Sequence, residues 1–330
     1  MSVVLACRSR GRTWIGPLAV AAVVLAGCTS VPSVPVAPAP SAPPASATPA
    51  PSASVVPDCG DPEQSLTPGA VPAAGAAPTG TFMRAIQRKG QLVAGVSADT
   101  QLFGARNPLT GQIEGFDIDV LREISTAIFG SPNKIEFRVI STADRIPALT
   151  NNQVDIVART MTVNCARWAQ IDFSSVYYKA GQKLMVPTDS KITSIATMAR
   201  GQSVCAPKGS TSIDRIKKDY PDLDPVEVAV HTDCLVLFQQ GKVDAITGDD
   251  AILAGFVSQD PYAKVVGSAF SSEPYGLGIS RAHPDFVRFV NGVLDRMRLD
   301  GTWKRLYDKW LRTPLGVDAN PPVAKYGRAA

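Results

Sequence analysis

Few side chains in this chain are suited to metal or nucleophilic chemistry. The 330 residues include two histidines, His231 and His283, so we expect neither a His-rich metal site nor a His-driven hydrolase. No nucleophile motif, Cys–His pair or glycine-rich phosphate loop is visible. The segment Gly209-Ser-Thr-Ser212 stands at the start of an expected helix, where N–H groups and the helix dipole attract an anion. These residues favour binding over catalysis.

The first 27 residues have the pattern of a secretory signal. Three arginines precede an apolar run that is shorter than the roughly 20 residues needed to span a bilayer. The run ends Leu25-Ala-Gly-Cys28, which resembles the lipobox of bacterial lipoproteins. The resemblance implies cleavage before Cys28, acylation of its thiol and a place on the extracytoplasmic face of the cell membrane. An ordinary signal peptide with a chance cysteine is the alternative.

Residues 28–80 are expected to be a lipid-anchored linker. Thirteen of the 27 prolines fall in residues 29–80, with Ala, Ser and Thr between them, and no apolar period is present. Such sequence favours an extended, semi-rigid spacer that holds the folded part off the membrane. A folded segment near Cys59 is left open.

Four of the six cysteines remain for disulfides once Cys7 is removed and Cys28 is acylated. Cys205 ends a strand-like segment and Cys234 opens a helix-like one, so a bridge between them would stay inside one domain. Its loop of about 30 residues would stabilise the fold by roughly 3–4 kcal/mol. Cys59–Cys165 follows by elimination, with two free thiols as the alternative. Zinc is not expected, because no CxxC spacing occurs.

From residue 81 on, strand-like and helix-like segments alternate. The strand-like runs are Leu92–Val96, Ile135–Ile140, Val154–Ala158, Lys183–Val186, Ser203–Ala206, Val226–Val230, Val243–Thr247 and Tyr275–Ile279. The helix-like segments are Asp117–Phe129, Thr142–Thr150, Ser212–Tyr220, Thr232–Gln240, Asp250–Ser258, Asp285–Leu299 and Thr302–Leu311. This alternation predicts an α/β protein with mostly parallel sheets flanked by helices. Two halves of this kind would enclose a cleft.

Six stretches in order resemble the bacterial extracytoplasmic solute-binding proteins of family 3, which bind polar amino acids. They are Gly115–Val120, Ile146–Asp155, Met161–Tyr178, Gly209–Ser212, Val243–Asp249 and Glu273–Gly276. The resemblance covers about residues 90–311 and is strongest to actinobacterial glutamate- and glutamine-binding lipoproteins, which share the GSTS element, the paired cysteines and a segment like Ile246–Gly255.

The resemblance implies a two-domain periplasmic-binding-protein fold of type II with a two-strand hinge. Domain 1 would be discontinuous, with residues 81–184 and 273–330, and domain 2 would span 188–269. The crossovers would lie near Val186 and Phe270, and ligand would close the domains.

The resemblance also implies a site for a free α-amino acid. Arg167, with Thr162, would hold the α-carboxylate, because arginine binds carboxylates through two donors. The ammonium would meet Asp249, Thr162 and the Thr160 carbonyl. The alternatives are an exposed Arg167 and a helix-capping Asp249, although Asp250 could serve as that cap.

Selectivity for the side chain would rest on two further cations, Arg145 and Arg159, although a strand-end Arg159 could instead point to solvent. The other candidates are Ser210, Thr211 and Lys208 for the ligand side chain, and Phe103, Tyr275 and Ser97 for the pocket wall. Phe103 and Tyr275 could also be ordinary core aromatics. Ser97 stands where several acidic binders have lysine, which leaves room for an amide ligand.

We therefore expect a protein that captures Glu or Asp, with Asn or Gln as alternatives, and delivers it to an ABC permease. A transmembrane sensor protein is the alternative partner, and a dehydratase- or lyase-type enzyme is the alternative activity. No catalytic residue, metal or cofactor is expected. The net charge of +4 argues against nucleic acid, and we expect a monomer.

Overall fold

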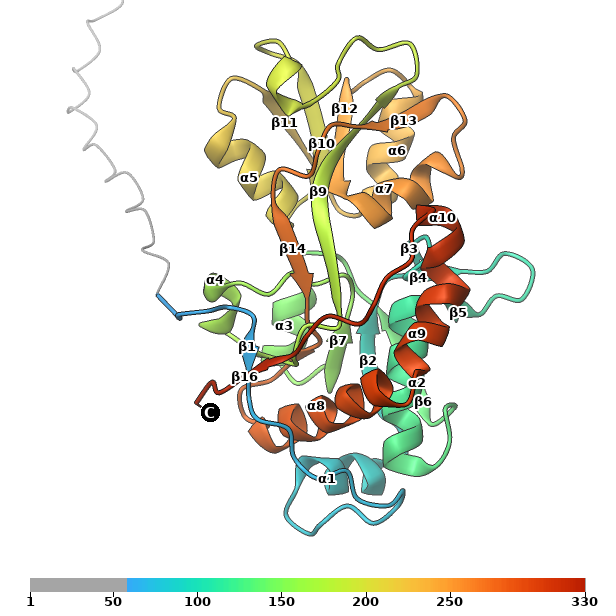
Figure 1. Ribbon diagram of the computed structural model, residues 1–330, viewed down its shortest axis with the longest axis vertical. Coiled ribbons are helices and arrows are strands. Elements are labelled where there is room, and N and C mark those ends of the chain that lie inside the picture. The colour runs from blue at the N-terminus through green and yellow to red at the C-terminus, as the bar shows by residue number, and fades with distance from the viewer. Residues whose placement is uncertain (1–57, 330) are drawn as a thin grey trace, which may run out of the picture. The chain divides into compact units, whose positions relative to one another are not determined.

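The computed structural model describes residues 58–329, which belong to one compact unit with two lobes (Figure 1). We call residues 58–181 with 272–329 lobe 1, and residues 182–271 lobe 2. The expected signal, Cys28 and the linker up to residue 57 lie outside the described residues. Among residues 58–329, no helix is long and apolar enough to cross a membrane.

Lobe 1 is built on a five-stranded sheet of order β6-β2-β7-β15-β8. Its strands are β2 (Leu92–Val96), β6 (Ile135–Val139), β7 (Ile156–Ala158), β8 (Asp172–Phe173) and β15 (Gly278–Ile279). All five residues of β2 are buried, as expected for a central strand covered by helices on both faces. A second, three-stranded sheet lies beside the cleft: β3 (Asp99–Thr100), β4 (Gly104–Arg106) and β5 (Ile113–Glu114).

The helices of lobe 1 pack around its five-stranded sheet and on one another. They are α1 (Phe82–Lys89), α2 (Phe116–Phe129), α3 (Arg145–Thr150), α4 (Cys165–Trp168), α8 (Pro284–Leu299), α9 (Thr302–Tyr307), a π-helical turn (Asp308–Arg312) and α10 (Thr313–Leu315). Helix α2 follows Gly115, whose φ is 144° and whose absent Cβ would lie 2.2 Å from the Phe103 carbonyl oxygen. Only glycine fits this close approach, which sets the direction in which α2 starts.

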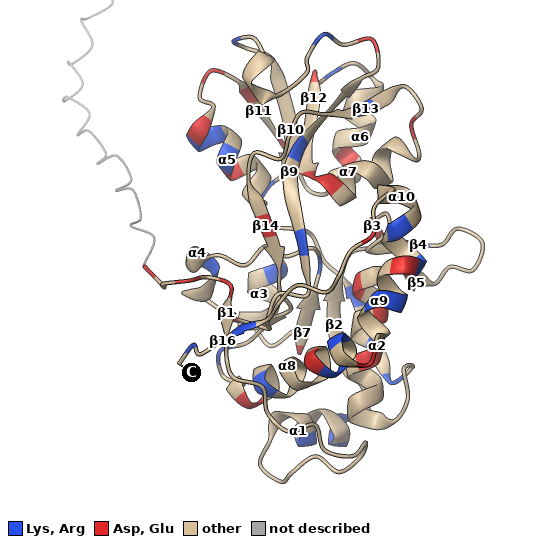
Figure 2. Ribbon diagram, viewed as in Figure 1, with Lys and Arg blue, Asp and Glu red and all other residues tan. Residues whose placement is uncertain are grey.

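Lobe 2 is built on a sheet of its own, whose strand order is β11-β10-β12-β9-β13. Its strands are β9 (Tyr178–Pro187), β10 (Ser203–Pro207), β11 (Asp224–Val228), β12 (Ala245–Asp249) and β13 (Ala263–Val266). Its helices are α5 (Thr211–Asp219), α6 (His231–Gln239), α7 (Asp250–Val257) and a 3₁₀ turn (Ile195–Thr197). Helix α5 carries both basic and acidic residues (Figure 2), and its inward residues Ile213 and Ile216 are fully buried. Cys205 and Cys234 form a disulfide that joins β10 to α6 inside this core.

Two antiparallel strands connect the lobes. The lower half of β9 pairs with β14 (Ser272–Tyr275), with Gly181 opposite Ser272 (Figure 1). Val186 already pairs with Lys264 inside lobe 2, so the first crossing lies about five residues earlier than the sequence indicated. The main sheet of each lobe is mixed. Strands that are joined by helices within a lobe are parallel, whereas the strands that enter from the hinge run antiparallel to them.

Residues 58–80, which the composition assigned to the linker, pack on lobe 1. Cys59 forms a disulfide with Cys165, and β1 (Gln64–Ser65) pairs in parallel with β16 (Lys325–Tyr326) near the C-terminus. Leu66 is 1% exposed, and its carbonyl accepts a hydrogen bond of 2.7 Å from the Asn291 amide. A disulfide and pairing with the far end of the chain hold this segment in place, so it folds without a periodic apolar face.

Candidate functional site

Seven of the predicted polar residues meet in a cavity between the lobes. Its lining comprises Thr142, Arg145, Arg159, Thr160, Thr162, Ser210, Thr211, Ser212, His231, Asp249 and Ile252. The enclosed space is about 20 Å³, room for about one water molecule, so a larger ligand requires the lobes to part or side chains to move. The lining combines two arginines, one acid and several hydroxyls, which suits a small polar molecule.

Arg145 crosses from lobe 1 to lobe 2. Its guanidinium donates to the carbonyls of Thr142, Arg159, Thr160 and Gly209, at 2.9–3.3 Å. All four acceptors are neutral carbonyl oxygens. Burial, with the charges of Arg167 and Arg159 nearby, lowers the pKa of the Arg145 guanidinium well below its usual value. The cavity therefore has a buried cation that lacks a hydrogen-bonded carboxylate.

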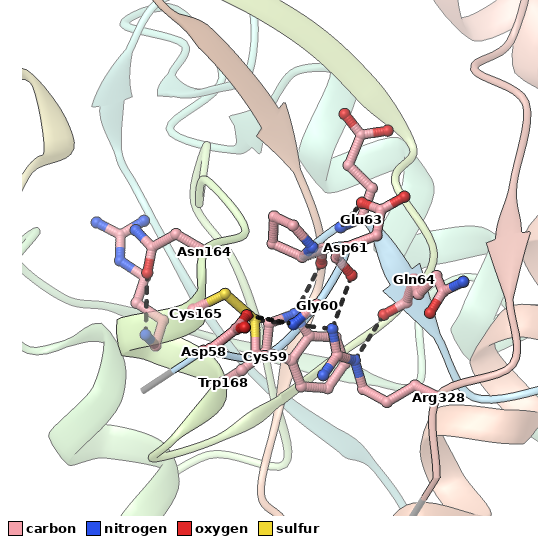
Figure 3. Close-up of a disulfide and its surroundings, with 12 residues drawn as sticks. Asp58, Cys59, Gly60, Asp61, Glu63, Gln64, Asn164, Cys165, Trp168 and Arg328 are labelled. Atoms are coloured by element: carbon pink, nitrogen blue, oxygen red, sulfur yellow. Dashed lines mark hydrogen bonds between the residues drawn. A yellow bond between two sulfur atoms is a disulfide. The ribbon is translucent and has the colours of Figure 1, made fainter. Parts of the chain in front are cut away.

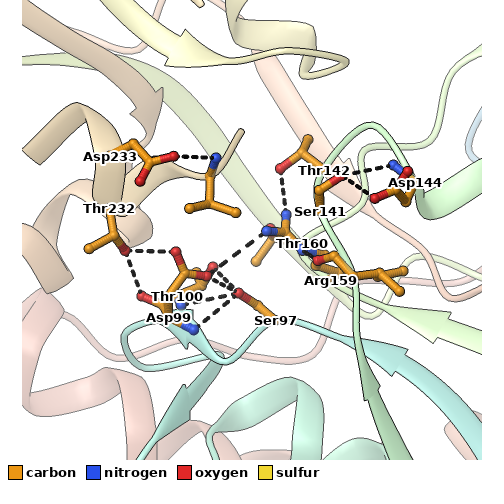
Figure 4. Close-up of polar contacts among 12 residues, drawn as sticks. Ser97, Asp99, Thr100, Ser141, Thr142, Asp144, Arg159, Thr160, Thr232 and Asp233 are labelled. Atoms are coloured by element: carbon orange, nitrogen blue, oxygen red, sulfur yellow. Dashed lines mark hydrogen bonds and ion pairs between the residues drawn. The ribbon is translucent and has the colours of Figure 1, made fainter. Parts of the chain in front are cut away.

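Arg159 lies beside the cavity and not in solvent. Figure 4 shows its guanidinium between the Thr142 hydroxyl, at 2.5 Å, and the Asp99 carboxylate, at 4.0 Å. Its exposed fraction is 4%, and burial lowers the pKa of its guanidinium. The alternative of a solvated strand end is therefore wrong.

Arg167 is the third residue of the four-residue helix α4 and is buried. It donates to the Thr162 carbonyl at 2.6 Å and to the Gly209 carbonyl of lobe 2 at 3.2 Å. The Asn164 side chain accepts from the Arg167 N–H and caps α4. Arg145 and Arg167 thus converge on one carbonyl oxygen, that of Gly209.

Thr160 has an unusual backbone that another side chain supports. Its φ is 42°, a left-handed conformation that is costly for a β-branched residue. The Thr160 N–H donates to an Asp117 oxygen at 2.9 Å, and the Tyr177 hydroxyl donates to the other at 2.6 Å. Burial raises the pKa of Asp117 to about 6, although both hydrogen bonds oppose the rise. The motif containing Asp117 was noticed in the sequence, but this supporting role was not.

Asp249 is the acid inside the cavity. The Tyr275 hydroxyl donates to its Oδ2, and its buried Oδ1 has no hydrogen-bond partner within the described part of the chain. Burial raises the pKa of Asp249 to about 8, and the nearby Glu273 charge adds to the rise. The neighbouring Asp250, at the start of α7, instead accepts from the N–H of Ala251 and from the N–H of Gly181 on β9.

Sequence reasoning missed Glu273, on hinge strand β14. One oxygen of this buried carboxylate accepts from the Thr162 hydroxyl of lobe 1, at 2.7 Å, and the Thr211 hydroxyl of lobe 2, at 2.8 Å. The other accepts from Ser271 at 2.5 Å. Glu273 therefore connects both lobes at the edge of the cavity. Its place in the Glu273–Gly276 motif was the available signal.

His231, at the start of α6, is another residue that the sequence did not predict, together with the lining residues Thr142, Ser212 and Ile252. It lines the cavity, and its Nε2 lies 3.3 Å from the Thr247 carbonyl oxygen. Burial lowers the pKa of His231 to about 4, so the ring is neutral near pH 7. One lone histidine carries little signal in a sequence, and only the lobe arrangement brings this ring to the cavity.

Five predicted residues lie outside the lining: Arg167, described above, and four more. Lys208 is exposed, because it belongs to the turn before α5. Phe103 is fully buried in lobe 1, with edge contacts to the rings of Phe116, Tyr178 and Tyr275. Ser97 bonds to Asp99 and Thr100 (Figure 4), and Tyr275 reaches the site through its hydroxyl. The structure thus places the expected aromatic wall behind the polar lining.

Ser210 and Thr211 line the cavity at the start of α5. The Ser210 hydroxyl accepts from the Ile213 N–H at 3.2 Å and so caps the helix. Thr211 bonds to Glu273, as described above. The helix N-terminus points its dipole toward the arginines of lobe 1, and an anion between them would be favoured from both sides.

Comparison with known sequences gives consistent matches. The sequence model of the bacterial extracellular solute-binding proteins, family 3, matches residues 92–313. The ABC transporter glutamine-binding protein GlnH of Bacillus subtilis is 36% identical over 230 residues, 70% of this chain and 84% of that protein. The glutamate-binding protein GluB of Corynebacterium glutamicum is 30% identical over 249 residues, 72% of this chain and 82% of that protein.

Solved structures share the two-lobed arrangement. An ancestral arginine-binding protein bound to glutamine is 31% identical, with a TM-score of 0.62 and coverage of 67% of this chain and 98% of that one. The solute receptors for L-cysteine of Neisseria gonorrhoeae are 26% identical, with a TM-score of 0.68 and coverage of 71% and 95%.

Proposed function

The chain belongs to the bacterial extracellular solute-binding proteins, family 3, and from this premise we propose that it captures a free polar amino acid between its lobes. The proposal rests on the buried Oδ1 of Asp249, which has no hydrogen-bond partner among residues 58–329 and lies in a cavity that two arginines also line. A buried acceptor without a donor is costly, and a ligand ammonium would satisfy it.

We assign the roles as the family resemblance implies them. Arg167 is not part of the lining, but, like the lining residue Arg145, it donates to the Gly209 carbonyl. Arg167 and the Thr162 hydroxyl hold the α-carboxylate, which takes over donors that now point to the Gly209 and Glu273 oxygens. The ammonium lies against Asp249, the Thr162 hydroxyl and the Thr160 carbonyl. The ligand side chain faces five of the remaining lining residues: Arg145, Arg159, Ser210, Thr211 and His231.

Glutamate and aspartate are the first candidates. Arg145 is buried and bonded only to neutral carbonyls, so an acidic side chain would add the missing negative charge. Glutamine, with asparagine, is the second candidate. It is favoured by the relative from Bacillus subtilis, which is a glutamine-binding protein, and by the two acids already at the site, Asp249 and Glu273.

The loaded protein would then deliver its amino acid to an ABC permease at the membrane. The relative from Bacillus subtilis is named as part of an ABC transporter, which supports this output. A lipid on Cys28 would keep the protein beside its partner. Mass spectrometry of the N-terminal peptide from membranes tests this anchor: an acylated Cys28 supports it, and an unmodified N-terminus contradicts it.

A melting screen of the twenty amino acids tests the ligand class. A ligand at 100 times its Kd stabilises a protein by about 2.7 kcal/mol, which raises Tm by roughly 5–10 °C for a chain of this size. We expect this shift with glutamate, aspartate or their amides. If all four leave Tm unchanged, the proposed function is wrong.

A further inference from the structure

Helix α4, which carries Arg167, is too short to hold its own position. It has four residues, Cys165–Trp168, and an isolated helix needs about 12–15 residues to be even marginally stable in water. Its place must therefore be fixed by contacts with other segments. Val163 N–H donates to the Pro274 carbonyl just before the helix, which fixes only the approach to it.

Residues 59–65, which we call the strap, supply contacts on both sides of Arg167. The Cys59–Cys165 disulfide joins the strap to the first residue of α4 (Figure 3). The indole N–H of Trp168, the last residue of α4, donates to the Pro62 carbonyl at 2.8 Å. Two anchors, at positions two before and one after Arg167, limit how far its backbone can move.

The C-terminal segment fastens the strap from the other side. The Arg328 guanidinium lies 4.1 Å from the centre of the Trp168 ring and donates to the carbonyls of Asp61 and Gln64, both at 2.8 Å (Figure 3). The β1–β16 pairing and the ion pair between Lys325 and Asp61 continue this contact. Both ends of the described chain thus meet on α4, and both lie outside residues 92–313, which match the family.

We propose that the strap, its disulfide and Arg328 are positioning elements that hold Arg167 in the orientation that binds the α-carboxylate. The inference rests on the proposed function. Two-point recognition of a carboxylate tolerates errors of about 0.5 Å, so loosening α4 weakens binding even though Arg167 itself is unchanged. The strap therefore sets affinity from outside the cavity.

The test is a double-mutant cycle on the full chain, with Kd for glutamate, or for whichever amino acid binds, measured by calorimetry. The strap variant is Cys59→Ser/Cys165→Ser, and the site variant is Arg167→Lys, which keeps the charge and loses the two-point geometry. We expect the strap variant to raise Kd about tenfold in the natural chain and less than about twofold beside Arg167→Lys.

Two further variants separate positioning from general stability. Cys205→Ser/Cys234→Ser removes the other disulfide, and its effect on Kd should be equal with Arg167 or Lys at position 167. Arg328→Gln keeps both disulfides, and we expect it to weaken binding in the same Arg167-dependent way if the double serine variant does not fold.

The results separate a failure of the positioning role from a failure of the proposed function. If the natural chain binds an amino acid and both strap variants bind it equally well, the positioning role is wrong. Equal losses with Arg167 and with Lys at position 167 also overturn it, because they indicate a structural effect alone. A natural chain that binds no amino acid contradicts the proposed function, and this inference with it.

Discussion

At the level of residues, the site is defined by buried charges that are only partly compensated. Arg145, Arg159 and Arg167 are each less than 9% exposed, and one oxygen of Asp249 has no partner in the described part of the chain. Such groups destabilise a ligand-free protein, and they favour a zwitterion that supplies the missing contacts. The same imbalance predicts which substitutions change selectivity and how binding depends on pH.

Arg145→Ala should change the preference between acids and amides. The substitution removes a cation from the side-chain end of the site, so we expect Kd for glutamate and aspartate to rise about 10- to 100-fold and Kd for glutamine to rise less. Calorimetry with the four ligands measures this. Arg200→Ala, an exposed arginine of lobe 2, is the matched control. Glutamate binding that is unchanged by Arg145→Ala would rule out the charge argument.

Binding should strengthen as the pH rises from about 6 to about 8. Asp249 is mostly protonated below its pKa of about 8, and a ligand ammonium favours the ionised form, so binding releases a proton. The affinity gain is at most about tenfold per pH unit and ends near pH 8. Calorimetry in two buffers of different ionisation heat measures the proton, and Asp249→Asn should give a weak, pH-independent affinity. A flat profile for the natural chain would contradict this assignment.

The raised pKa of Asp249 also predicts how the stability of the ligand-free protein changes with pH. Between the usual Asp value of 3.8 and about 8, the folded state binds more protons at Asp249 than the unfolded state does. The contribution of Asp249 to the stability of the ligand-free protein is therefore complete below about pH 4 and is lost as the pH rises toward 8. Comparing Asp249→Asn with the natural chain by urea unfolding isolates this contribution, which the variant should lack.

The sequence predicted the lining by residue type and motif, and it failed where tertiary placement decides the role. Arg145, Arg159, Thr160, Thr162, Ser210, Thr211 and Asp249 all line the cavity. Glu273 and His231 were missed because a hinge strand and a helix start bring them there from distant positions. Phe103 was expected on the wall, but an apolar ring gains more by packing among other aromatic rings in the core.

At the level of elements, the hinge strand β14 does more than connect the lobes. Its Glu273 bonds to one hydroxyl on each lobe, Thr162 and Thr211, so the strand also fixes how the lobes meet.

Strands with clear apolar runs, such as β2 and β10, were predicted within a residue or two. Helices α1 and α4 were missed because four to eight residues show little of the helical period, and the β3–β5 sheet was missed because strands of two or three residues show little alternation.

Glu273→Gln should weaken ligand binding and shift its pH dependence. The amide replaces one accepting oxygen with an N–H₂ group, so the Thr211 bond that joins β14 to lobe 2 is weakened and Kd should rise about 5- to 10-fold. Removing the negative charge also lowers the pKa of Asp249, so the pH dependence should move to lower pH. Calorimetry across pH measures both effects, with Glu227→Gln as the surface control. An unmoved pH profile would show that Glu273 does not act on Asp249.

At the level of the whole molecule, two lobes close on a polar cavity, and both ends of the described chain, residues 58–329, meet on lobe 1. The α/β alternation and six ordered motifs were sufficient to predict the two-lobed fold. Composition alone could not show that residues 58–80 pack on lobe 1, because Cys59, Leu66 and Ala77 are held individually and not by a periodic pattern. The sequence also misplaced the first crossing, since β9 continues without a break from one lobe into the other.

Calorimetry of the natural chain and of Arg167→Ala, with glutamate, aspartate, glutamine and asparagine as ligands, tests whether the site binds an amino acid through Arg167. We predict that the natural chain binds at least one of the four at a single site, whereas Arg167→Ala, with its fold confirmed by circular dichroism, binds none. Arg200→Ala should bind like the natural chain. Binding by Arg167→Ala with an unchanged Kd, or no binding of these four by the natural chain, would contradict the account.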